Sequence, residues 1–302
     1  MRKKKIALVA GGAGFLGSHI VKRLIAEGVK VRLVDLPNTS LDKRLSSAIG
    51  DPNLSVEQVD ILTLPANHTI FADVQDFFQC ILVGNHRQSI IEPEHVFQPN
   101  LMPTIRILEA ARLHLGARVH CVSSSAVYGN VSGEVSEETP RQANTAYGLV
   151  KLFQEQTVAY WQKMYNVPTI IYRPFLCYGP GDESGGVVDI FIQKIREGKP
   201  LTIIGDGKSG RDFVHVTDVV DAFVLCWESK IANSVYNVGT GQLTTIKKLA
   251  NIMGGQIEYE EARAFDEPSF ANIDRIKDEI GWRPKISLED GIAAIMEKVK
   301  RG

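Results

Sequence analysis

Tyr147 and Lys151 are the two side chains whose types and spacing best suit proton transfer. They stand four residues apart in a segment with helical periodicity, so they share one face of a helix. A free tyrosine has a pKa of about 10, and lowering that pKa by about three units requires roughly 4 kcal/mol. An ammonium group about 4 Å away supplies about 4 kcal/mol at an effective dielectric constant near 20. Tyr147 is therefore a candidate general base and acid for a hydroxyl substrate, with Lys151 lowering its pKa.

Three consecutive serines add hydroxyl groups to this pair. Ser123, Ser124 and Ser125 follow an apolar run that ends at Val122, which places them at the carboxyl end of a predicted strand. Open α/β sheets bind their ligands at that edge. Serines in a capping turn are the alternative interpretation. The nearby tyrosine and lysine favour the catalytic one.

A second candidate site follows the first predicted strand. Gly11, Gly14 and Gly17 have the spacing of a phosphate-binding turn that opens a helix. The first glycine permits the tight turn, the second lets the backbone approach a pyrophosphate, and the third lets the helix pack against the strand. The helix N-terminus adds free N–H groups and a partial positive charge. A purely structural turn is the alternative for a glycine-rich loop on its own.

Asp35 favours the dinucleotide interpretation of this turn. It ends the second predicted strand about 20 residues further on, where a carboxylate accepts hydrogen bonds from the adenosine ribose. The same charge repels a 2′-phosphate, so the sequence predicts NAD in preference to NADP. Asp60 ends the third strand, where it either binds adenine or caps a helix. The predicted cofactor contacts are Gly11, Gly14, Phe15, Leu16, Gly17, Asp35, Asp60, Ile61, Val83, Tyr147, Lys151 and Arg173.

Apolar runs that alternate with helical patterns position these residues. Strands are predicted at 6–10, 31–34, 56–59, 81–83, 119–122 and 169–172, and helices at 15–27, 94–115 and 144–165. Continuous apolar strands indicate a parallel sheet that is covered on both faces. The predicted fold class is therefore α/β, with a doubly wound parallel sheet of the Rossmann type.

The domain organisation is predicted from a change of pattern after residue 174. Residues 1–174 would form the NAD-binding Rossmann domain, and residues 175–302, with shorter elements and Gly/Pro-rich loops, a smaller C-terminal substrate-binding lobe. Segment 217–240 reads as a helix at 217–227 followed by a strand at 235–238. We expect this segment to return to the main sheet.

Composition limits the classes of partner and compartment. The 34 basic and 35 acidic residues nearly balance, so no global field attracts nucleic acid or an anionic membrane. No apolar run approaches membrane-spanning length. Cys80, Cys121, Cys177 and Cys226 lie far apart without a CxxC pair, which predicts reduced thiols in place of disulfides or a metal site. We expect a cytoplasmic protein that binds no metal.

Several motifs in order give a specific family resemblance. They are GGAGFLG at 11–17, SSSAVYG at 123–129, YGLVK at 147–151, YGPG at 178–181, GDGKSGRDFVHVTDV at 205–219, YNVGTG at 236–241 and GWRP at 281–284. Asp35, Asn100, segment 138–140 and segment 173–175 fit the same pattern. Over nearly its whole length the chain resembles the extended short-chain dehydrogenase/reductases, in particular the NAD-dependent epimerase/dehydratase group that includes UDP-glucose 4-epimerase.

The resemblance implies roles for individual residues. Ser124, three residues before Val127, would complete a catalytic triad with Tyr147 and Lys151. Arginines would contact the diphosphate of a nucleotide sugar, and a phenylalanine would crowd the C2 substituent of the sugar. Pairing through segments 94–115 and 144–165 would make a homodimer. The predicted substrate contacts are Asn100, Ser125, Arg211, Arg263 and Phe270.

The reaction that the resemblance implies is epimerisation at C4 of a nucleoside diphosphate hexose, with a UDP-sugar favoured, through a 4-keto intermediate. NAD would then stay bound as a prosthetic group. Ser125 and Ala126 stand where related dehydratases and decarboxylases carry acidic residues, which disfavours elimination of water. The alternatives are an NAD(P)-dependent nucleotide-sugar reductase or dehydrogenase, a dehydratase, and a non-catalytic NAD-binding protein. The chain departs from the family pattern in segment 81–92, which contains His86 and Arg87, and at Leu176, where an asparagine is common.

Overall fold

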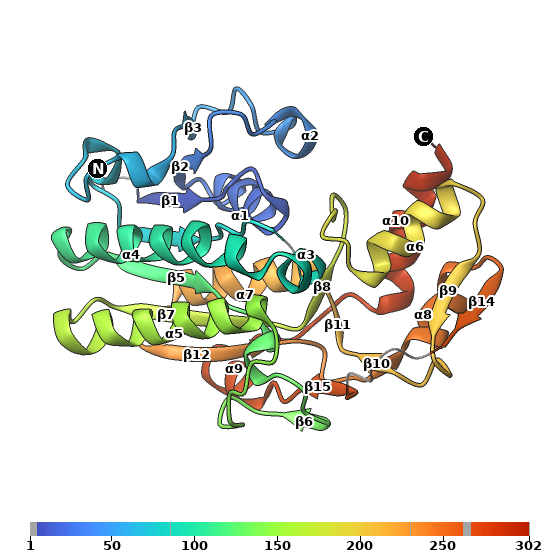
Figure 1. Cartoon of the computed structure of the whole chain (residues 1–302). Helices are drawn as coiled ribbons and strands as arrows, with labels where there is room; N and C mark the ends of the chain where they lie inside the picture. The colour runs from blue at the N-terminus through green and yellow to red at the C-terminus, as the bar shows by residue number, and fades with distance from the viewer. Residues whose placement is uncertain (1–4, 85, 230, 262–266, 302) are drawn as a thin grey trace.

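The computed structural model describes residues 5–84, 86–229, 231–261 and 267–301. Within these ranges a parallel sheet of seven strands, in the order β12-β7-β5-β4-β1-β2-β3, forms the centre of the larger part of the molecule (Figure 1). Every neighbouring pair in this sheet is parallel. The strands are β1 (Ile6–Ala10), β2 (Lys30–Asp35), β3 (Leu54–Gln58), β4 (Asp76–Gln79), β5 (Arg118–Val122), β7 (Thr169–Pro174) and β12 (Ser234–Val238).

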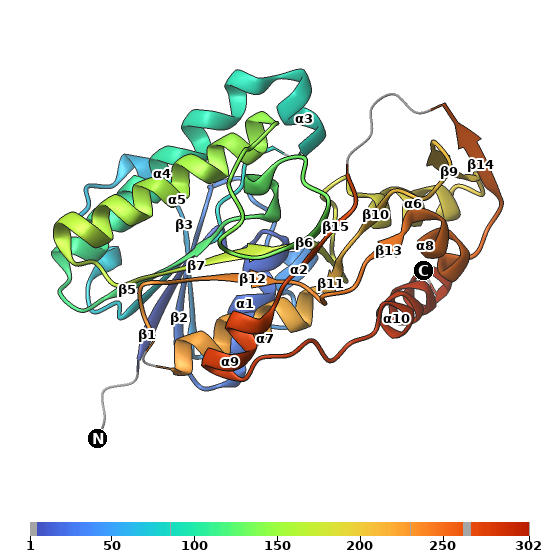
Figure 2. The same cartoon turned by 90° about the horizontal axis from the view of Figure 1, so that it is seen from below.

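Helices cover both faces of this sheet, as Figure 2 shows. One face packs against α1 (Phe15–Ala26) and α7 (Val216–Glu228), and its core includes Val9, Ile20 and Phe223. The other face packs against α4 (Phe97–Leu113) and α5 (Ala146–Tyr165), and its core includes Leu8 and Ile107. Consecutive strand residues thus point into opposite cores. The predicted doubly wound α/β fold is confirmed.

The strand predicted at 81–83 is wrong, because β4 lies earlier in the chain. Its polar ends, Asp76 and Gln79, hid it in the sequence, and both are buried with partners: the Gln79 amide donates to the Thr104 hydroxyl at 2.7 Å. The apolar run at 81–83 continues past the end of the strand. The helix predicted at 94–115 is divided into a 3-10 turn, η3 (Pro93–Val96), and α4.

Shorter elements follow the main strands and lead toward the carboxyl edge of the sheet. They include α2 (Asp42–Leu45) and α3 (His86–Ile91), together with a small helix, α9 (Asp274–Ile280), which packs beside β12. The 3-10 turns at this edge are η1 (Ile61–Thr63) and η4 (Ser125–Tyr128), and η2 (Thr69–Phe71) precedes β4. Of the residues assigned to the cofactor and the substrate, η1 contains Ile61 and η4 contains Ser125.

A smaller lobe lies beside the carboxyl edge of the sheet (Figure 1). Its helices are α6 (Val187–Arg196), α8 (Ile246–Met253) and α10 (Leu288–Arg301), and they share a core with β9 (Leu201–Ile204). β9 pairs with β14 (Ile257–Glu260), and β8 (Leu176–Tyr178) pairs with β11 (Phe213–His215). A four-stranded sheet has the order β13 (Thr244–Thr245), β10 (Gly210–Arg211), β15 (Ser269–Ala271), β6 (Gly133–Val135).

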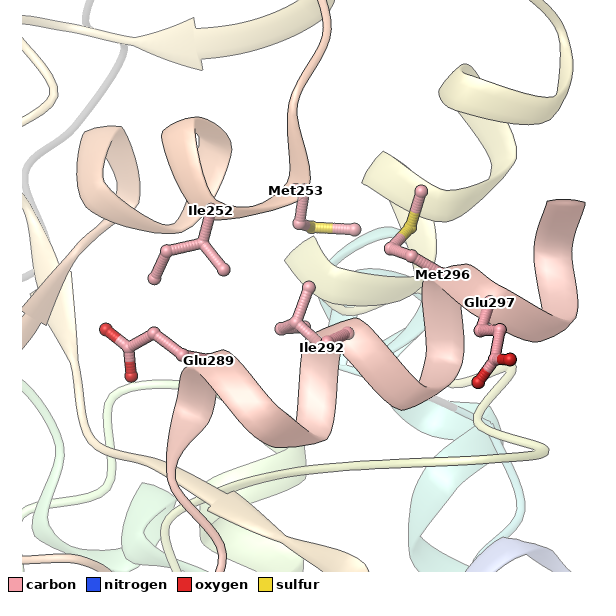
Figure 3. A pocket seen from close by; sticks show the side chains of 7 residues that line it. Ile252, Met253, Glu289, Ile292, Met296 and Glu297 are labelled. Carbon is pink, nitrogen blue, oxygen red and sulfur yellow. The ribbon is translucent and has the colours of Figure 1, made fainter.

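A surface hollow lies between α8 and α10 of this lobe. Figure 3 shows Ile252 and Met253 facing Ile292 and Met296 across it, with Glu289 at one end. None of the residues assigned to catalysis, cofactor or substrate lines it. The hollow is therefore separate from the candidate active site.

No helix within the described ranges has both the length and the apolar character needed to cross a bilayer. The same residues contain no cluster of His, Cys, Asp and Glu side chains that would hold a metal ion. All four cysteines are free thiols.

A buried polar cluster joins the amino ends of β4 and β5. His120, which is fully buried, contacts the Tyr172 hydroxyl through Nδ1 at 2.8 Å and the Asp76 carboxylate through Nε2 at 3.3 Å. Arg118 and Trp227 donate to the same carboxylate at 2.8 and 3.0 Å. Arg118 and Asp76 therefore form an ion pair. The His120 imidazole lies between this ion pair and the Tyr172 side chain.

We expect acid to destabilise the protein through His120. Burial lowers the pKa of His120 below its ordinary value of 6.5, and the Asp76 carboxylate only partly opposes this. The unfolded chain regains the ordinary pKa, so below about pH 6.5 it binds a proton that the folded protein does not. Stability that is present above that pH is lost as the pH falls, by up to about 1.4 kcal/mol per pH unit.

Urea unfolding at about pH 7.5 and about pH 5.5 measures this dependence. The variant His120→Gln should lose stability overall and show a smaller decrease between the two pH values. His95→Gln, which changes an exposed histidine, is the matched control and should keep the parent's pH dependence. An unchanged pH dependence in His120→Gln would contradict the assignment.

Candidate active site

The glycine turn connects β1 to α1 at the carboxyl edge of the sheet. Gly11 has a φ of +76°, and its N–H donates to the Val34 carbonyl at 2.9 Å. A Cβ on Gly17 would lie 2.2 Å from the Gly11 carbonyl oxygen, so only glycine lets α1 begin this close to the turn. Among the described atoms, a Cβ on Gly14 would meet one neighbour within 4 Å, the same oxygen at 3.2 Å. The outer side of Gly14 is therefore open to a ligand.

The first turn of α1 offers backbone donors beside this opening. Phe15, Leu16 and Gly17 form the turn, and Gly14 precedes it as an N-cap without a side-chain hydrogen bond. The first N–H groups of a helix have no partner within the helix, and the helix dipole makes this end positive. The turn therefore suits a pyrophosphate.

Asp35 lies at the end of β2, next to the glycine turn. One carboxylate oxygen accepts a hydrogen bond from the Ala13 N–H at 2.9 Å. The other accepts from the Leu36 N–H at 2.9 Å and from the Thr39 hydroxyl at 3.0 Å. The carboxylate is partly exposed, so it can also accept from a ribose hydroxyl. This position relative to the turn is the one that adenosine binding requires.

Asp60 follows β3 and caps the 3-10 turn η1. Its carboxylate accepts the Leu62 N–H at 2.9 Å, and Ile61 is buried in the core beside it. Of the two roles that the sequence suggested for Asp60, this is the capping role. Contacts of Asp60 and Ile61 with adenine stay predictions.

A close approach of α5 to η4 places the catalytic tyrosine. α5 begins after Thr145, whose hydroxyl oxygen accepts the Gly148 N–H at 3.1 Å. A Cβ on Gly148 would lie 2.5 Å from the Ala126 carbonyl oxygen, so a larger residue would force the helix away from η4. Tyr147, the preceding residue, is thereby brought against the serine segment.

Ser124 and Tyr147 meet at this contact, and Lys151 lies one turn further along α5. The Ser124 hydroxyl, which caps η4 by accepting the Ala126 N–H at 3.2 Å, is also hydrogen-bonded to the Tyr147 side chain. Lys151 is buried, and its ammonium donates to the Val122 carbonyl at 2.8 Å. The structure thus brings together the three residues that the sequence proposed as a triad.

Burial dominates the electrostatics of this triad. It raises the pKa of Tyr147, and the hydrogen bond to Ser124 opposes that effect. It lowers the pKa of Lys151, with a partial offset from Cys121 and Cys80. Both shifts favour the neutral side chains. The lowering of the Tyr147 pKa that the sequence predicts from Lys151 and the positively charged nicotinamide of NAD stays a prediction.

Glu155 anchors the helix of Tyr147 and Lys151 and was not predicted from the sequence. It lies one turn after Lys151, and its carboxylate accepts from Arg173 at 2.9 and 2.7 Å and from the Ser123 hydroxyl at 2.5 Å. Burial raises the pKa of Glu155, but the Arg173 guanidinium, the Ser123 hydroxyl and Arg141 together outweigh it, so the net shift of the pKa is downward. A Glu four residues after the lysine, on the same helix face, was the available signal.

Arg173 was predicted to contact the cofactor, and the structure corrects this. Its guanidinium is 3% exposed and is occupied by Glu155, by the Tyr128 hydroxyl at 2.8 Å and by the Glu137 carbonyl at 3.2 Å. Tyr128 in turn donates to Asn237 at 2.6 Å. Arg173 therefore connects α5, η4 and β12 inside the protein.

Asn100 holds the segment that follows β4. Its side-chain oxygen accepts the Val83 N–H at 2.8 Å, and its amide donates to the carbonyls of Val83 at 2.9 Å and Val96 at 2.6 Å. The side chain is fully buried, so in this structure it positions Val83 and does not face a ligand. Val83 itself is 40% exposed and remains available to the cofactor.

Two predicted substrate residues lie in neighbouring strands of the smaller lobe. β10 pairs with β15, placing Arg211 opposite Ser269 and next to Phe270, and both Arg211 and Phe270 are partly exposed. Ser125 is also partly exposed and begins η4. Arg263 lies outside the described residues. Substrate contacts by these residues stay predictions.

Comparison with known proteins identifies the family. Residues 7–239 match the NAD-dependent epimerase/dehydratase family. The chain belongs to this family. It is 31% identical over 304 residues to a putative UDP-glucose 4-epimerase of Methanocaldococcus jannaschii, covering 97% of this chain and 98% of the relative. It is 30% identical to the UDP-glucose 4-epimerase of Mycolicibacterium smegmatis, covering 96% and 97%.

A solved relative shares the whole architecture of this family member. The UDP-glucuronic acid 4-epimerase of Bacillus cereus, in complex with UDP-glucuronic acid and NAD, superposes with a TM-score of 0.89 at 26% identity, covering 98% of this chain and 99% of the other. The cofactor of this epimerase/dehydratase family member is NAD. The open side of Gly14, the uncapped start of α1 and the carboxylate of Asp35 fit its pyrophosphate and ribose.

We expect Asp35→Ala to change the choice between NAD and NADP. The variant loses the ribose acceptor and the charge that repels a 2′-phosphate, so NAD affinity should fall by about 10- to 100-fold and the preference for NAD over NADP should shrink. Titration calorimetry on cofactor-stripped protein measures both affinities. Asp35→Asn keeps the side-chain size and one oxygen acceptor but removes the charge, so it separates the charge from the shape of the side chain. If both variants discriminate as the parent does, Asp35 does not recognise the ribose.

Proposed function

We propose that this protein interconverts the C4 epimers of a nucleoside diphosphate hexose, with a UDP-sugar as the preferred class. The observation that carries the proposal is the contact of Ser124 with Tyr147 beside the buried Lys151. It lies at the same sheet edge as the glycine turn. The relatives named above act on UDP-glucose or are bound to UDP-glucuronic acid, which supports the substrate class.

The residues of this site provide acid and base catalysis at one sugar hydroxyl. NAD, when bound, supplies reversible hydride transfer at the carbon that bears this hydroxyl. Tyr147 takes the hydroxyl proton through its phenolic oxygen and later returns it, and Ser124 holds the same sugar oxygen. Because burial raises the pKa of Tyr147, ionisation of its phenol requires positive charge at the site.

The neighbouring residues also support epimerisation over elimination of water. Ser125 and Ala126 follow Ser124 directly and carry no carboxylic acid that would protonate a leaving hydroxyl. A 4-keto intermediate formed in this site can therefore rotate and accept hydride on its opposite face. The reaction has no net redox change, so the cofactor does not need to leave between turnovers.

We expect Tyr147→Phe to lower turnover by at least about 100-fold, because it removes the proton carrier and keeps the ring. Epimerisation is measured with UDP-sugars and no added NAD, so activity also reports the cofactor that the protein retains. Tyr165→Phe, at an exposed tyrosine of the same helix, is the control and should behave as the parent. A fully active Tyr147→Phe protein with normal NAD content would remove Tyr147 from the mechanism.

We propose that Arg211 binds the diphosphate of the substrate, since a guanidinium gives two parallel hydrogen bonds to phosphate oxygens. Its Nη1 donates to the Gly210 carbonyl at 2.7 Å, which holds the head group beside β15. Arg211→Ala should weaken UDP binding by about 10- to 100-fold in calorimetry and raise KM more than it lowers kcat. Arg196→Ala changes an exposed arginine of α6 and is the control. Parent-like UDP affinity in Arg211→Ala would refute the assignment.

Phe270 is proposed to restrict the C2 substituent of the sugar. It lies in β15, next to the strand of Arg211, and its register partner in β6 is Glu134. A ring in this place would favour a hexose over the corresponding N-acetylhexosamine.

We also propose a homodimer through the outer face of α4 and α5. Apolar side chains stay exposed there, among them Met102 at 42%, Phe153 at 36% and Tyr160 at 50%. Analytical ultracentrifugation should give a dimer for the parent and a monomer for Phe153→Glu. Tyr259→Glu, at an exposed aromatic residue of β14, should remain dimeric. A monomeric parent would exclude this assembly.

The proposed compartment is the cytoplasm. Four free thiols among the described residues are in keeping with a reducing environment. The proposed chemistry needs no metal, nucleic acid or membrane partner.

A further inference from the structure

The loop 179–186 extends from the smaller lobe toward the cofactor side of the sheet. It begins after β8, which is fixed by its pairing with β11, and it ends at Gly186, the N-cap of α6. A Cβ on Gly179 would lie 2.4 Å from the Val216 side chain, so the start of the loop is packed tightly against α7. In Figure 1 the loop rises beside β8 toward α1 and α2.

Hydrogen bonds within the loop fix its shape. Asp182 is 8% exposed, and its carboxylate accepts the Ser184 N–H at 2.9 Å. Asp189, in the first turn of α6, accepts the Gly185 N–H at 2.9 Å. The loop is therefore held in one conformation by its own residues and by the helix that follows.

Two helices of the NAD-binding half hold the far side of this loop. His19, in α1, contacts the Pro180 carbonyl through Nε2 at 3.0 Å. Arg44, in α2, donates through Nε to the Gly181 carbonyl at 3.0 Å and through Nη2 to the Glu183 carboxylate at 3.0 Å. The Arg44 side chain is only 18% exposed, so these bonds are partly shielded from water.

A third charge strengthens the contact at Glu183. Lys43, next to Arg44, forms an ion pair with the same carboxylate. Together the lysine and the arginine hold the pKa of Glu183 below its ordinary value. The loop is thus attached by one carbonyl to α1, and by one carbonyl and one carboxylate to α2.

These attachment points lie close in the chain to the residues predicted to bind the dinucleotide. His19 follows the glycine turn by a little over one helical turn of α1, and α2 follows the segment that Asp35 begins. That segment is itself fixed, because Thr39 donates to Asp35 and the Gln58 amide donates to the carbonyls of Pro37 and Thr39. A cofactor extending from Gly14 to Asp35 would have to pass this bridge to leave on the side of the lobe.

We propose that the loop 179–186 is a latch that slows the release of NAD, with His19, Arg44 and Glu183 as the positioning residues that hold it closed. This inference rests on the proposed function, in which NAD stays bound from one turnover to the next. Since the smaller lobe supplies the loop and the NAD-binding half supplies its anchors, cofactor retention depends on contact between the two.

The test measures cofactor exchange directly. Protein loaded with isotopically labelled NAD is mixed with excess unlabelled NAD, and the label that stays with the protein is followed over time on desalting columns. Arg44→Ala removes both bonds to the loop and should speed the loss of label about 10-fold, the effect of about one charged hydrogen bond. Glu183→Gln, which keeps the Gly181 contact, should speed it about threefold, in the range of an exposed ion pair.

Two matched variants control for charge and folding. Glu197→Gln makes the same change in the exposed Glu197–Lys199 pair of the same lobe and should release label at the parent rate. The charge exchange Arg44→Glu with Glu183→Arg should release label more slowly than either single change. Thermal unfolding of each variant, measured alongside, confirms that the fold is intact.

The outcomes separate the latch from the reaction. Parent-like release in folded Arg44→Ala, or a parent that exchanges label as fast as this variant, overturns the latch. Epimerisation without added NAD is assayed on the same preparations. A parent that holds NAD through the latch but turns over none of the UDP-sugars would count against the proposed function and leave the latch supported.

Discussion

The buried ion pair between Glu155 and Arg173 is the interaction on which the arrangement of the site depends. It joins α5, which carries Tyr147 and Lys151, to the end of β7, and through Ser123 it reaches the end of β5. Removing one partner of such a pair leaves an uncompensated buried charge, which costs about 3–5 kcal/mol, whereas the intact pair contributes little net stability. Its value here is geometric. It fixes the helix register that brings the tyrosine to the serine.

Two close backbone contacts also fix the arrangement of the site. Gly17 lets α1 start against the glycine turn, and Gly148 lets α5 lie against η4. In both places a glycine lets two backbone segments approach more closely than a side chain would allow. The first contact forms the predicted phosphate site, and the second brings Tyr147 to Ser124. Asp212 has a similar role in the smaller lobe, where its buried carboxylate accepts N–H groups from Thr240, Gly241 and Ala271. Rigid contacts of this kind keep the two halves of the site in a fixed relation.

The sequence predicted the features that local spacing determines. The strands at 6–10 and 119–122 follow from continuous apolar runs, and the glycine turn follows from its spacing. The helical pair Tyr147 and Lys151 follows from a period of about four residues. Features that depend on distant partners were lost. β4 was displaced because Asp76 and Gln79 look exposed until Arg118, His120 and Thr104 are placed beside them. Arg173 was misassigned for the same reason, because its partners are contributed by α5 and η4.

The path of the chain through the sheet makes the two parts of the molecule interdependent. After β7 the chain builds much of the smaller lobe, then returns through α7 to place β12 beside β7. A polypeptide ending at Pro174 would expose the long edge of β7 and uncover the face of the sheet against which α7 packs. The boundary predicted at residue 174 marks a change of sequence pattern, and the sheet continues beyond it through β12. A transplant of the sheet into another protein would have to carry β12 and α7 with it.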